Sequence, residues 1–313
     1  MNDAPQKPIA DSIPKTHSAV FAGYAAIFVV MILIMIKGYA YYESGAVSIL
    51  SSLIDSVLDS LVSVMALSSI YYARRPADAD HRWGHGKMEA VSALFQSAII
   101  VGGAVFLAFE ALDRIVHPVV MTHHWIGIYV MGISVILSGF LVLIQRRALQ
   151  RSSSLAVEAD SVHYGSDILV NIGTLIVLAV SFYGAPSWLD GLFAMGVAGF
   201  MVYMARGIAV KSLDMLLDRE LSDDDRARII KVIESHEKVA GWHDLRTHRN
   251  GADYVMSFDI EVDPEMLLWA AHDIAKDLEE GILKLYPAAE VLIHIDPEGY
   301  IEDARHRVKG VHI

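Results

Sequence analysis

The sequence predicts an α-helical membrane protein, with six transmembrane helices followed by a cytoplasmic α+β domain in the element order αββαβ. Three observations lead to this fold class. Hydrophobic residues make up 54% of the 313 residues, a higher share than soluble domains usually carry. Six apolar windows are long enough to cross a bilayer, which takes about 20 residues. The last third of the chain shows amphipathic helix and strand patterns instead.

A polar N-terminal tail, residues 1–17, precedes the membrane helices and is expected to be cytoplasmic. The first apolar run after it is too long for a signal peptide and has no convincing cleavage site, so we interpret it as a retained helix. The membrane domain is predicted over residues 18–210. Its six helices are expected at roughly Ala19–Tyr42, Val47–Tyr72, Ala90–Val116, Trp125–Ile144, Val162–Tyr183 and Leu189–Ile208.

The orientation follows from the lysines and arginines of the connections, which favour the cytoplasmic side. The second and fourth connections are rich in them, whereas the first and fifth contain none and the third contains only Arg114. Both termini and the even-numbered connections are therefore predicted to be cytoplasmic. The basic residues concerned are Arg74, Arg75, Arg82, Lys87, Arg146, Arg147 and Arg151.

Residues 211–300 are predicted to form the cytoplasmic α+β domain, ferredoxin-like and similar to metallochaperones, with residues 301–313 as a C-terminal tail. The segment "LSDDDRARIIKVIESHE" has Ser222 as a candidate N-cap, acids in the first turn and an apolar helical stripe. Strand character is found in "GWHDLRTH", "DYVMSFDIEV" and "AEVLIHID". An amphipathic helix is expected for "PEMLLWAAHDIAKDLEEGILKLYP".

The composition excludes several functional classes. A net charge of −12 argues against a nucleic-acid partner, which would require a basic surface. The absence of cysteine excludes disulfides and cysteine-based metal sites, so a metal would need His, Asp or Glu ligands. The sequence has no phosphate loop, HExxH motif or GxSxG elbow. Neither ATP drive, an organic cofactor nor enzymatic activity is therefore expected.

Two aspartates, Asp55 and Asp59, lie in the apolar run "SLIDSVLDSLVSVM" of the second window. Because they are four residues apart they share one helix face. Each costs about 2.5–3.5 kcal/mol at the centre of a membrane helix. Polar bonding between helices is one explanation. Intramembrane acids are functional sites by default, however, so a binding site is the preferred interpretation.

A matching pair, His163 and Asp167, lies in the fifth window. If the two helices face each other, Asp55, Asp59, His163 and Asp167 offer three oxygens and one nitrogen. That set suits a tetrahedral divalent metal such as Zn²⁺. Metal ions and protons compete for these ligands, because the ligands bind metal only when deprotonated. The sequence therefore predicts a site that exchanges a metal cation for protons.

Two further groups of potential ligands lie outside the membrane helices. The second connection contains Asp78, His81 and His85 in "PADADHRWGHGK", a spacing that can wrap one ion, with a solvated polar loop as the alternative. The cytoplasmic domain is dense in His and Asp for a cysteine-free domain, which makes metal binding and ordinary surface positions equal alternatives. The residues concerned are His243, Asp259, His272, His294 and Asp296.

These motifs together resemble the cation diffusion facilitator family, and within it the bacterial zinc and ferrous-iron efflux type. The resemblance rests on "DSVLD", "GHGKME", "HYGSD", "LLDR", "HDLRT" and "IHIDP", and it covers roughly Ser18 to Pro297. It implies a homodimeric, multi-pass protein of the bacterial inner membrane that exports divalent metal from the cytoplasm against an inward flow of protons. Zn²⁺ is the expected ion, with Cd²⁺ and Fe²⁺ as alternatives. Mn²⁺ fits less well because it prefers an oxygen-rich shell.

The resemblance also implies roles for the candidate ligands. The intramembrane set would be the transport site, the second connection would hold a loop site, and the cytoplasmic set would hold structural ions that support dimer contact. Lys87 and Asp218 match an ionic pair at the membrane–cytoplasm junction. Asp259 stands where this type usually has histidine, which implies a cytoplasmic metal that is weaker, differently coordinated or absent.

Two other functions fit parts of the sequence. A metal-binding membrane scaffold or sensor would dimerise through its tail and bind metal without moving protons. A membrane metallohydrolase would use the same acids to activate water, but the sequence offers no further acid–base or nucleophile motif for it. Proton-coupled efflux by alternating access is therefore the preferred hypothesis.

Overall fold

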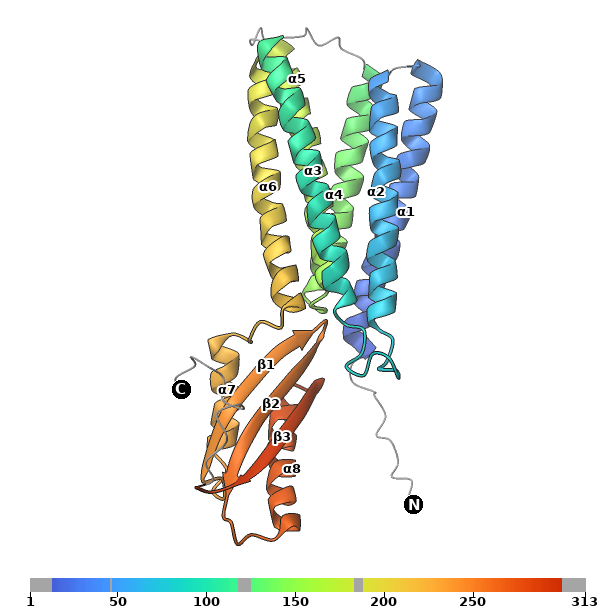
Figure 1. Ribbon diagram of the computed structural model, residues 1–313. Coiled ribbons are helices and arrows are strands. Elements are labelled where there is room, and N and C mark those ends of the chain that lie inside the picture. Colours follow the sequence, from blue (N-terminus) through green and yellow to red (C-terminus); the bar gives the residue numbers. More distant parts are fainter. Residues whose placement is uncertain (1–12, 46, 118–124, 183–187, 300–313) are drawn as a thin grey trace. The chain divides into compact units, whose positions relative to one another are not determined.

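The computed structural model describes residues 13–45, 47–117, 125–182 and 188–299 (Figure 1). The chain divides into two compact units, Met1–Leu213 and Asp214–Ile313. The first unit consists of long helices. The second contains a three-stranded sheet with helices packed on it.

Six long helices account for the first unit: α1 (Ile13–Ser44), α2 (Val47–Ala73), α3 (Met88–Val116), α4 (Trp125–Leu149), α5 (Leu155–Phe182) and α6 (Trp188–Leu216). Over the described residues, five of them are long and apolar enough to cross a membrane, and α5 is not among these five. Helix α5 also carries three acidic residues, Glu158, Asp160 and Asp167. Such groups enter a membrane when they face other helices, and α5 packs against α2, α3 and α4. Its membrane crossing stays a prediction.

Helix α5 begins about two turns earlier than predicted, at Leu155 rather than Val162. Ser154 precedes its first turn, and the Ser154 hydroxyl accepts the Val157 N–H at 3.4 Å. The same hydroxyl donates to the Glu89 carboxylate of α3 at 2.6 Å. A search for apolar runs misses this start because the first turns of α5 carry acids.

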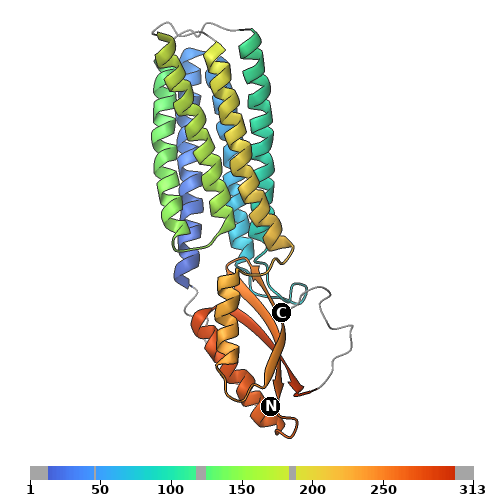
Figure 2. The same ribbon diagram turned by 90° about the vertical axis from the view of Figure 1, so that its left-hand side faces the viewer.

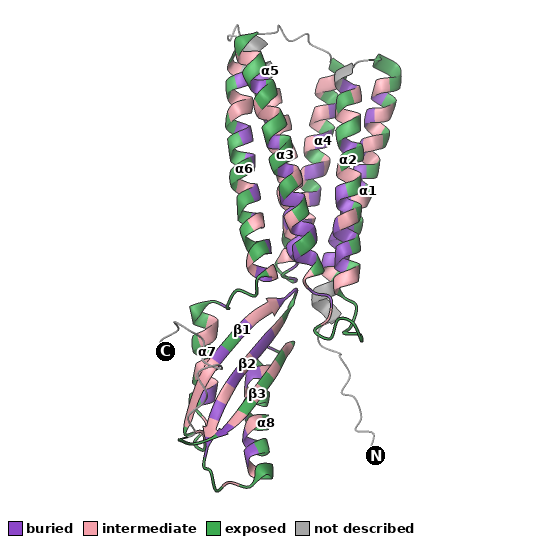
Figure 3. Cartoon of the chain, in the orientation of Figure 1, coloured by how far each residue is buried: buried purple, intermediate pink, exposed green. Residues whose placement is uncertain are grey.

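The membrane helices combine close internal contacts with an apolar exterior. A Cβ atom at Gly23 of α1 would lie 2.7 Å from Leu67 Cδ1 of α2, so the two helices approach more closely than a larger residue allows. Large apolar side chains such as Phe28, Phe106 and Tyr129 are exposed, and exposed faces run along the helices in Figure 3. This pattern is typical of helices that pack through small residues and face lipid.

The second unit has the predicted order of helix, strand, strand, helix, strand. Its elements are α7 (Asp223–Glu234), β1 (Gly241–Asn250), β2 (Asp253–Val262), α8 (Leu268–Leu285) and β3 (Ala289–Pro297). The sheet order is β1-β2-β3, with β1 antiparallel and β3 parallel to β2. Both helices cover the same face of the sheet (Figures 1 and 2).

The core of the second unit lies between this sheet face and the two helices. Phe258 of β2, Ile233 of α7 and Leu278 of α8 belong to one buried cluster. Ser222 is the N-cap of α7, as predicted, and its hydroxyl accepts the Asp225 N–H at 3.2 Å. The alternation of buried and half-buried residues along β2 leaves the polar side chains on the opposite face of the sheet, where candidate metal ligands gather.

Candidate metal centres

The first candidate centre lies between α2 and α5 in the membrane unit. His163 Nε2 is 2.9 Å from Asp59 Oδ1 and 3.9 Å from Asp167 Oδ2. Each of the three residues offers a ligand atom within 4.8 Å of the others. The side chains of His163 and Asp59 are 12% and 17% exposed, so the group lies mostly inside the helix bundle. The two helices therefore do face each other here.

Asp55, the fourth predicted ligand, lies outside this three-residue group. It is one turn before Asp59 on α2 and is exposed within the single chain. Asp59, Lys37 and Glu110 are the charged groups that act on its carboxylate. The structure thus brings three of the four predicted ligands together and places Asp55 next to them along the helix.

Polar residues that extend the same face of α5 bond elsewhere. The Asp160 carboxylate is buried and accepts from Gln145 Nε2 of α4 at 2.6 Å and from Ser63 Oγ of α2 at 3.3 Å. Asn171 donates to the Asp167 carbonyl at 2.8 Å. Asp160 therefore joins three helices rather than belonging to the ligand group.

Sequence reasoning missed one charged residue near this centre, Lys37 of α1. It is 7% exposed, and its ammonium donates to Ser56 Oγ at 2.7 Å and to the Ser52 carbonyl at 3.1 Å. The signal was present in the sequence, because a lone lysine within the apolar run "MILIMIKGYA" is as unusual as an aspartate.

The second candidate centre is the connection between α2 and α3. Asp78 Oδ1 lies 3.5 Å from His81 Nδ1, and Asp78 Oδ2 lies 3.4 Å from His85 Nε2. The rings of His81 and His85 are 4.6 Å apart, and His85 stacks edge-on against Tyr72 at 4.9 Å. All three predicted loop residues therefore come together, with His85 buried and the other two exposed.

Two backbone N–H groups of this loop donate hydrogen bonds to the Asp78 carboxylate. The N–H groups of His81 and Asp80 donate to Asp78 Oδ1 at 2.7 and 3.0 Å. The pKa of Asp78 lies below its usual range, mainly because of the backbone bond from His81. The bond from Asp80 and the nearby His85 act in the same direction. The carboxylate is therefore ionised at neutral pH, the form in which it binds a cation.

The third candidate centre lies on the sheet of the second unit. His243 of β1 is paired in register with Asp259 of β2, and its Nδ1 is 3.5 Å from Asp259 Oδ2. His243 Nε2 lies 3.7 Å from Asp296 Oδ2 of β3 and 3.8 Å from Glu261 Oε1. Sequence reasoning missed Glu261, although it follows Asp259 by two residues and so shares its strand face.

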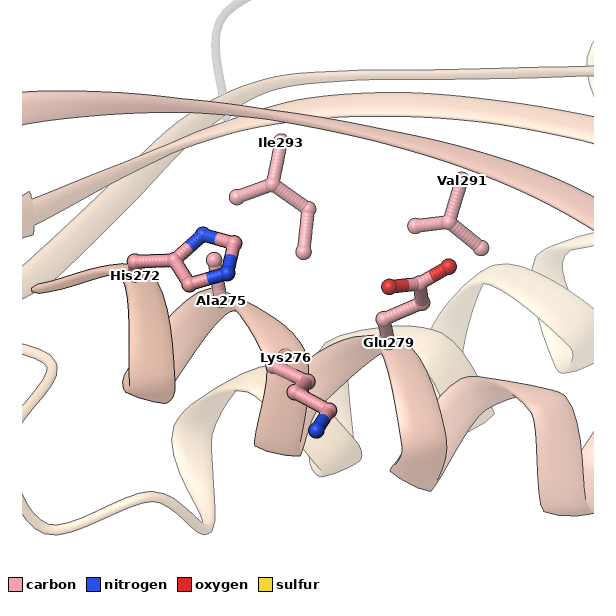
Figure 4. A pocket seen from close by; sticks show the side chains of 6 residues that line it. All are labelled: His272, Ala275, Lys276, Glu279, Val291 and Ile293. Atoms are coloured by element: carbon pink, nitrogen blue, oxygen red, sulfur yellow. The ribbon is translucent and has the colours of Figure 1, made fainter. Parts of the chain in front are cut away.

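The remaining two predicted ligands of this domain, His272 and His294, are not members of the three-residue group of His243, Asp259 and Asp296. His294 is 63% exposed, with its Nε2 3.3 Å from Asp296 Oδ1. His272 lies on α8 and lines an open pocket of about 350 Å³ between α8 and β3, with Lys276, Glu279 and Ile293 (Figure 4). Within one copy of the described chain, His294 therefore adjoins the group, opposite Asp259 in the β2–β3 register, whereas His272 lies on α8.

The donor sets fit a divalent transition metal. Each group combines imidazole nitrogen with carboxylate oxygen, the ligands that Zn²⁺ and similar ions take in proteins. Among the described residues, Asp296 Oδ2 is buried and has no hydrogen-bond partner, as a carboxylate oxygen reserved for a cation would be. The predicted ion pair of Lys87 with Asp218 joins different units and stays a prediction; His248 Nε2 lies 3.5 Å from Asp218 Oδ1.

Long apolar helices around a half-buried imidazole–carboxylate group, followed by a small α+β domain with a similar group, define a multi-pass membrane protein with candidate cation sites. The family model described as the cation efflux transmembrane domain matches residues 24–217, and that of the cation efflux protein cytoplasmic domain matches residues 221–298. The chain therefore belongs to the cation diffusion facilitator family of cation efflux transporters.

Similar proteins agree with this assignment over most of the chain. The chain is 38% identical to a protein named cation-efflux pump FieF from Pectobacterium carotovorum, over 92% of this chain and 96% of the relative. It is 40% identical to a protein of the same name from Shewanella oneidensis, over 88% and 93%. Among solved structures, the metal-bound C-terminal domain of the CzcD transporter from Thermotoga maritima is 34% identical, with a TM-score of 0.25, over 25% of this chain and 93% of that domain.

Proposed function

We propose that this efflux transporter is a proton-coupled antiporter that exports divalent transition-metal cations from the cytoplasm. Zn²⁺ fits best, with Cd²⁺ and Fe²⁺ as alternatives. The observation that carries the proposal is the group of Asp59, His163 and Asp167 between α2 and α5. Its single imidazole favours a borderline metal over Ca²⁺ and Mg²⁺, which prefer oxygen ligands alone.

The proposed cycle uses the competition between cargo and protons. The cation binds from the cytoplasm when His163 is neutral and the aspartates are ionised, and Asp55 joins the set as the fourth ligand. The helix pair then reorients toward the other side. Protons from that side bind the carboxylates and His163, and because a protonated ligand cannot hold the metal, the cation leaves. Return of the protonated site completes the exchange.

The soluble unit is proposed to dimerise with a second copy and to hold structural metal ions. His272 and His294 are exposed in the single chain, where a second copy can approach them. The loop group of Asp78, His81 and His85 is proposed as a further metal site. We place the protein in the bacterial inner membrane, in lipid, with both termini in the cytoplasm, because the basic connections favour that side.

A non-transporting scaffold or sensor is the second candidate function. The same ligand groups would support metal binding in such a protein. The two functions differ in cation movement across a membrane, which a scaffold does not catalyse.

The experiment is Zn²⁺ entry into proteoliposomes that contain a metal-sensitive dye. Wild-type protein is expected to carry Zn²⁺, and Asp59→Ala is expected to abolish entry while the purified protein still elutes as a folded dimer. Asp113→Asn is the matched control, because it removes an acid whose side chain is 73% exposed and pairs with His117. Wild-type rates in Asp59→Ala would reject the site.

A further inference from the structure

Lys37 is a buried charge that the proposed cycle does not use. In the part of the chain that the structure describes, it is the only lysine or arginine among the buried residues. Its two acceptors, Ser52 and Ser56, belong to one turn of α2. That turn carries Asp55 and directly precedes the turn of Asp59, so the ammonium of α1 lies against the ligand-bearing segment of α2.

Hydrogen bonds to a hydroxyl and a carbonyl do not by themselves explain a charge at this depth. Removing an ammonium from water costs several kcal/mol even after relaxation, and charged residues within membrane helices pair with one another or with backbone carbonyls. The acids whose charges act on Lys37 are Asp59, Asp167 and Asp55. All three are predicted ligands of the transport site.

Other charged groups nearby already have partners. Asp160 accepts from Gln145 and Ser63. Glu110 of α3 pairs with Arg114 one turn along the same helix. Lys37 is therefore the buried lysine whose charge interacts with the ligand carboxylates.

The charges of the site then balance. With His163 neutral, three ligand carboxylates and one divalent cation leave one negative charge, and the Lys37 ammonium cancels it. A net charge is costly in a medium of low dielectric constant. The neutral charge of the metal-loaded site therefore favours the reorientation of the helix pair that carries it.

We propose that Lys37 is a positioning residue of the transport site, a built-in cation that neutralises the metal-loaded set of carboxylates and keeps metal affinity low enough for release. This inference rests on the proposed function, because it assigns the three aspartates to the transport site. Removal of the positive charge takes away a repulsion that the bound metal feels. The metal is then held more tightly and leaves more slowly.

A purely structural role of Lys37 predicts the opposite change in metal affinity. If Lys37 only tethers α1 to α2 through Ser52 and Ser56, its loss loosens the site and weakens metal binding. Lys37→Gln separates the two roles, because the amide keeps a hydrogen-bond donor but carries no charge. Lys37→Arg keeps both the hydrogen-bond donor and the positive charge. Lys211→Gln is the matched control, since Lys211 is an exposed lysine of α6 that pairs with Glu158.

The experiment measures Zn²⁺ binding by the purified full chain. The part of the binding that is lost in Asp59→Ala is assigned to the transport site. KM and kcat are measured for Zn²⁺ entry into proteoliposomes. We expect Lys37→Gln to lower both Kd and KM on the order of tenfold and to lower kcat, an effect typical of one unit charge nearby. Lys37→Arg and Lys211→Gln are expected to retain wild-type values.

Unchanged or weaker Zn²⁺ binding in Lys37→Gln overturns the proposal, and so does a Lys37→Arg variant that behaves like Lys37→Gln. If Lys37→Gln does not fold, Lys37→Met removes the same charge without burying an amide, and the same outcomes decide. A wild-type protein that binds Zn²⁺ but carries none contradicts the proposed function, while the Kd comparison still decides the role of Lys37.

Discussion

Asp160 and Gln145 illustrate, at the scale of single residues, how the membrane unit keeps polar groups away from lipid. The carboxylate is 2% exposed and receives hydrogen bonds from two neighbouring helices. Ser63 also bonds the hydroxyl of the buried Tyr164 at 2.9 Å. Gln145 Oε1 is buried without a hydrogen-bond partner, so the network stabilises this unit through the donors to Asp160, and loss of one donor leaves a carboxylate oxygen unpaired.

Gln145→Leu is therefore expected to destabilise the membrane unit. The substitution removes the amide donor from a buried carboxylate, and hydrogen bonds to charged groups contribute about 1.5–3 kcal/mol. The measurement is thermal unfolding of the purified protein in detergent. Ser134→Ala is the control, because Ser134 is buried in the same helix but its hydroxyl donates to the Val130 carbonyl of its own helix. Equal melting temperatures for the two variants would contradict this account.

At the scale of elements, the apolar windows predicted where the helices lie better than where they begin. The start of α5 was missed because Ser154, Glu158 and Asp160 interrupt the apolar pattern, although neighbouring helices bond all three. Spacing along each helix predicted the pairs Asp55–Asp59 and His163–Asp167. It could not predict that Asp55 lies outside the three-residue group, or that Lys37 reaches α2, because these depend on how neighbouring helices pack.

Strand register explains a second limit of sequence prediction. The alternating pattern predicted β2 and β3, but the neighbour of His243 depends on pairing between strands. The register places Asp259 opposite His243 and brings Glu261 opposite Asp296. The β1 strand also has a register shift between His243 and Arg246, with a positive φ at Asp244, which no simple alternation indicates.

A hydrogen bond between the two helices of the second unit, α7 and α8, makes the stability of that unit depend on pH. Tyr286, the C-cap residue of α8, donates to Asp225 Oδ1 of α7 at 2.8 Å. Burial and this bond raise the pKa of Tyr286 to about 12. The hydroxyls of Ser222 and Tyr286 hold the pKa of Asp225 below its usual range.

The signs of the two effects differ. A raised tyrosine pKa stabilises the fold below the unfolded value of about 10, and this contribution is lost as pH rises toward about 12. A lowered aspartate pKa stabilises the fold above the unfolded value of about 3.9, and this contribution is lost as pH falls below it. Tyr286→Phe should lower stability at neutral pH by about 1 kcal/mol and flatten the alkaline loss.

Urea unfolding at several pH values tests this prediction. Unfolding is monitored by tryptophan fluorescence in a variant that keeps Trp242 as its sole tryptophan. Trp242 packs against the core of the second unit and so reports the unfolding of that unit. An alkaline loss of stability that is as steep in Tyr286→Phe as in the parent protein would show that the Tyr286–Asp225 bond is not its cause.

At the scale of the whole molecule, the proposed direction of transport depends on the orientation of the helices in the membrane. The chain has no cysteine, so a single introduced cysteine reports its own side. In intact cells, Ser44→Cys at the end of α1, next to the first connection, is expected to react with a membrane-impermeant maleimide. Ser153→Cys in the fourth connection should react only after permeabilisation. The reverse pattern would place the termini outside and reverse the proposed direction of export.

The central claim is that metal and protons exchange at one intramembrane site. Its most direct test is internal pH in proteoliposomes that contain a pH-sensitive dye, recorded as Zn²⁺, Cd²⁺, Fe²⁺ or Mn²⁺ is added outside. Wild-type protein should raise internal pH as metal enters and protons leave, Mn²⁺ should be the weakest ion, and Asp59→Ala should give no change. Metal entry without any pH change, or tight binding without entry of any ion, would contradict the account.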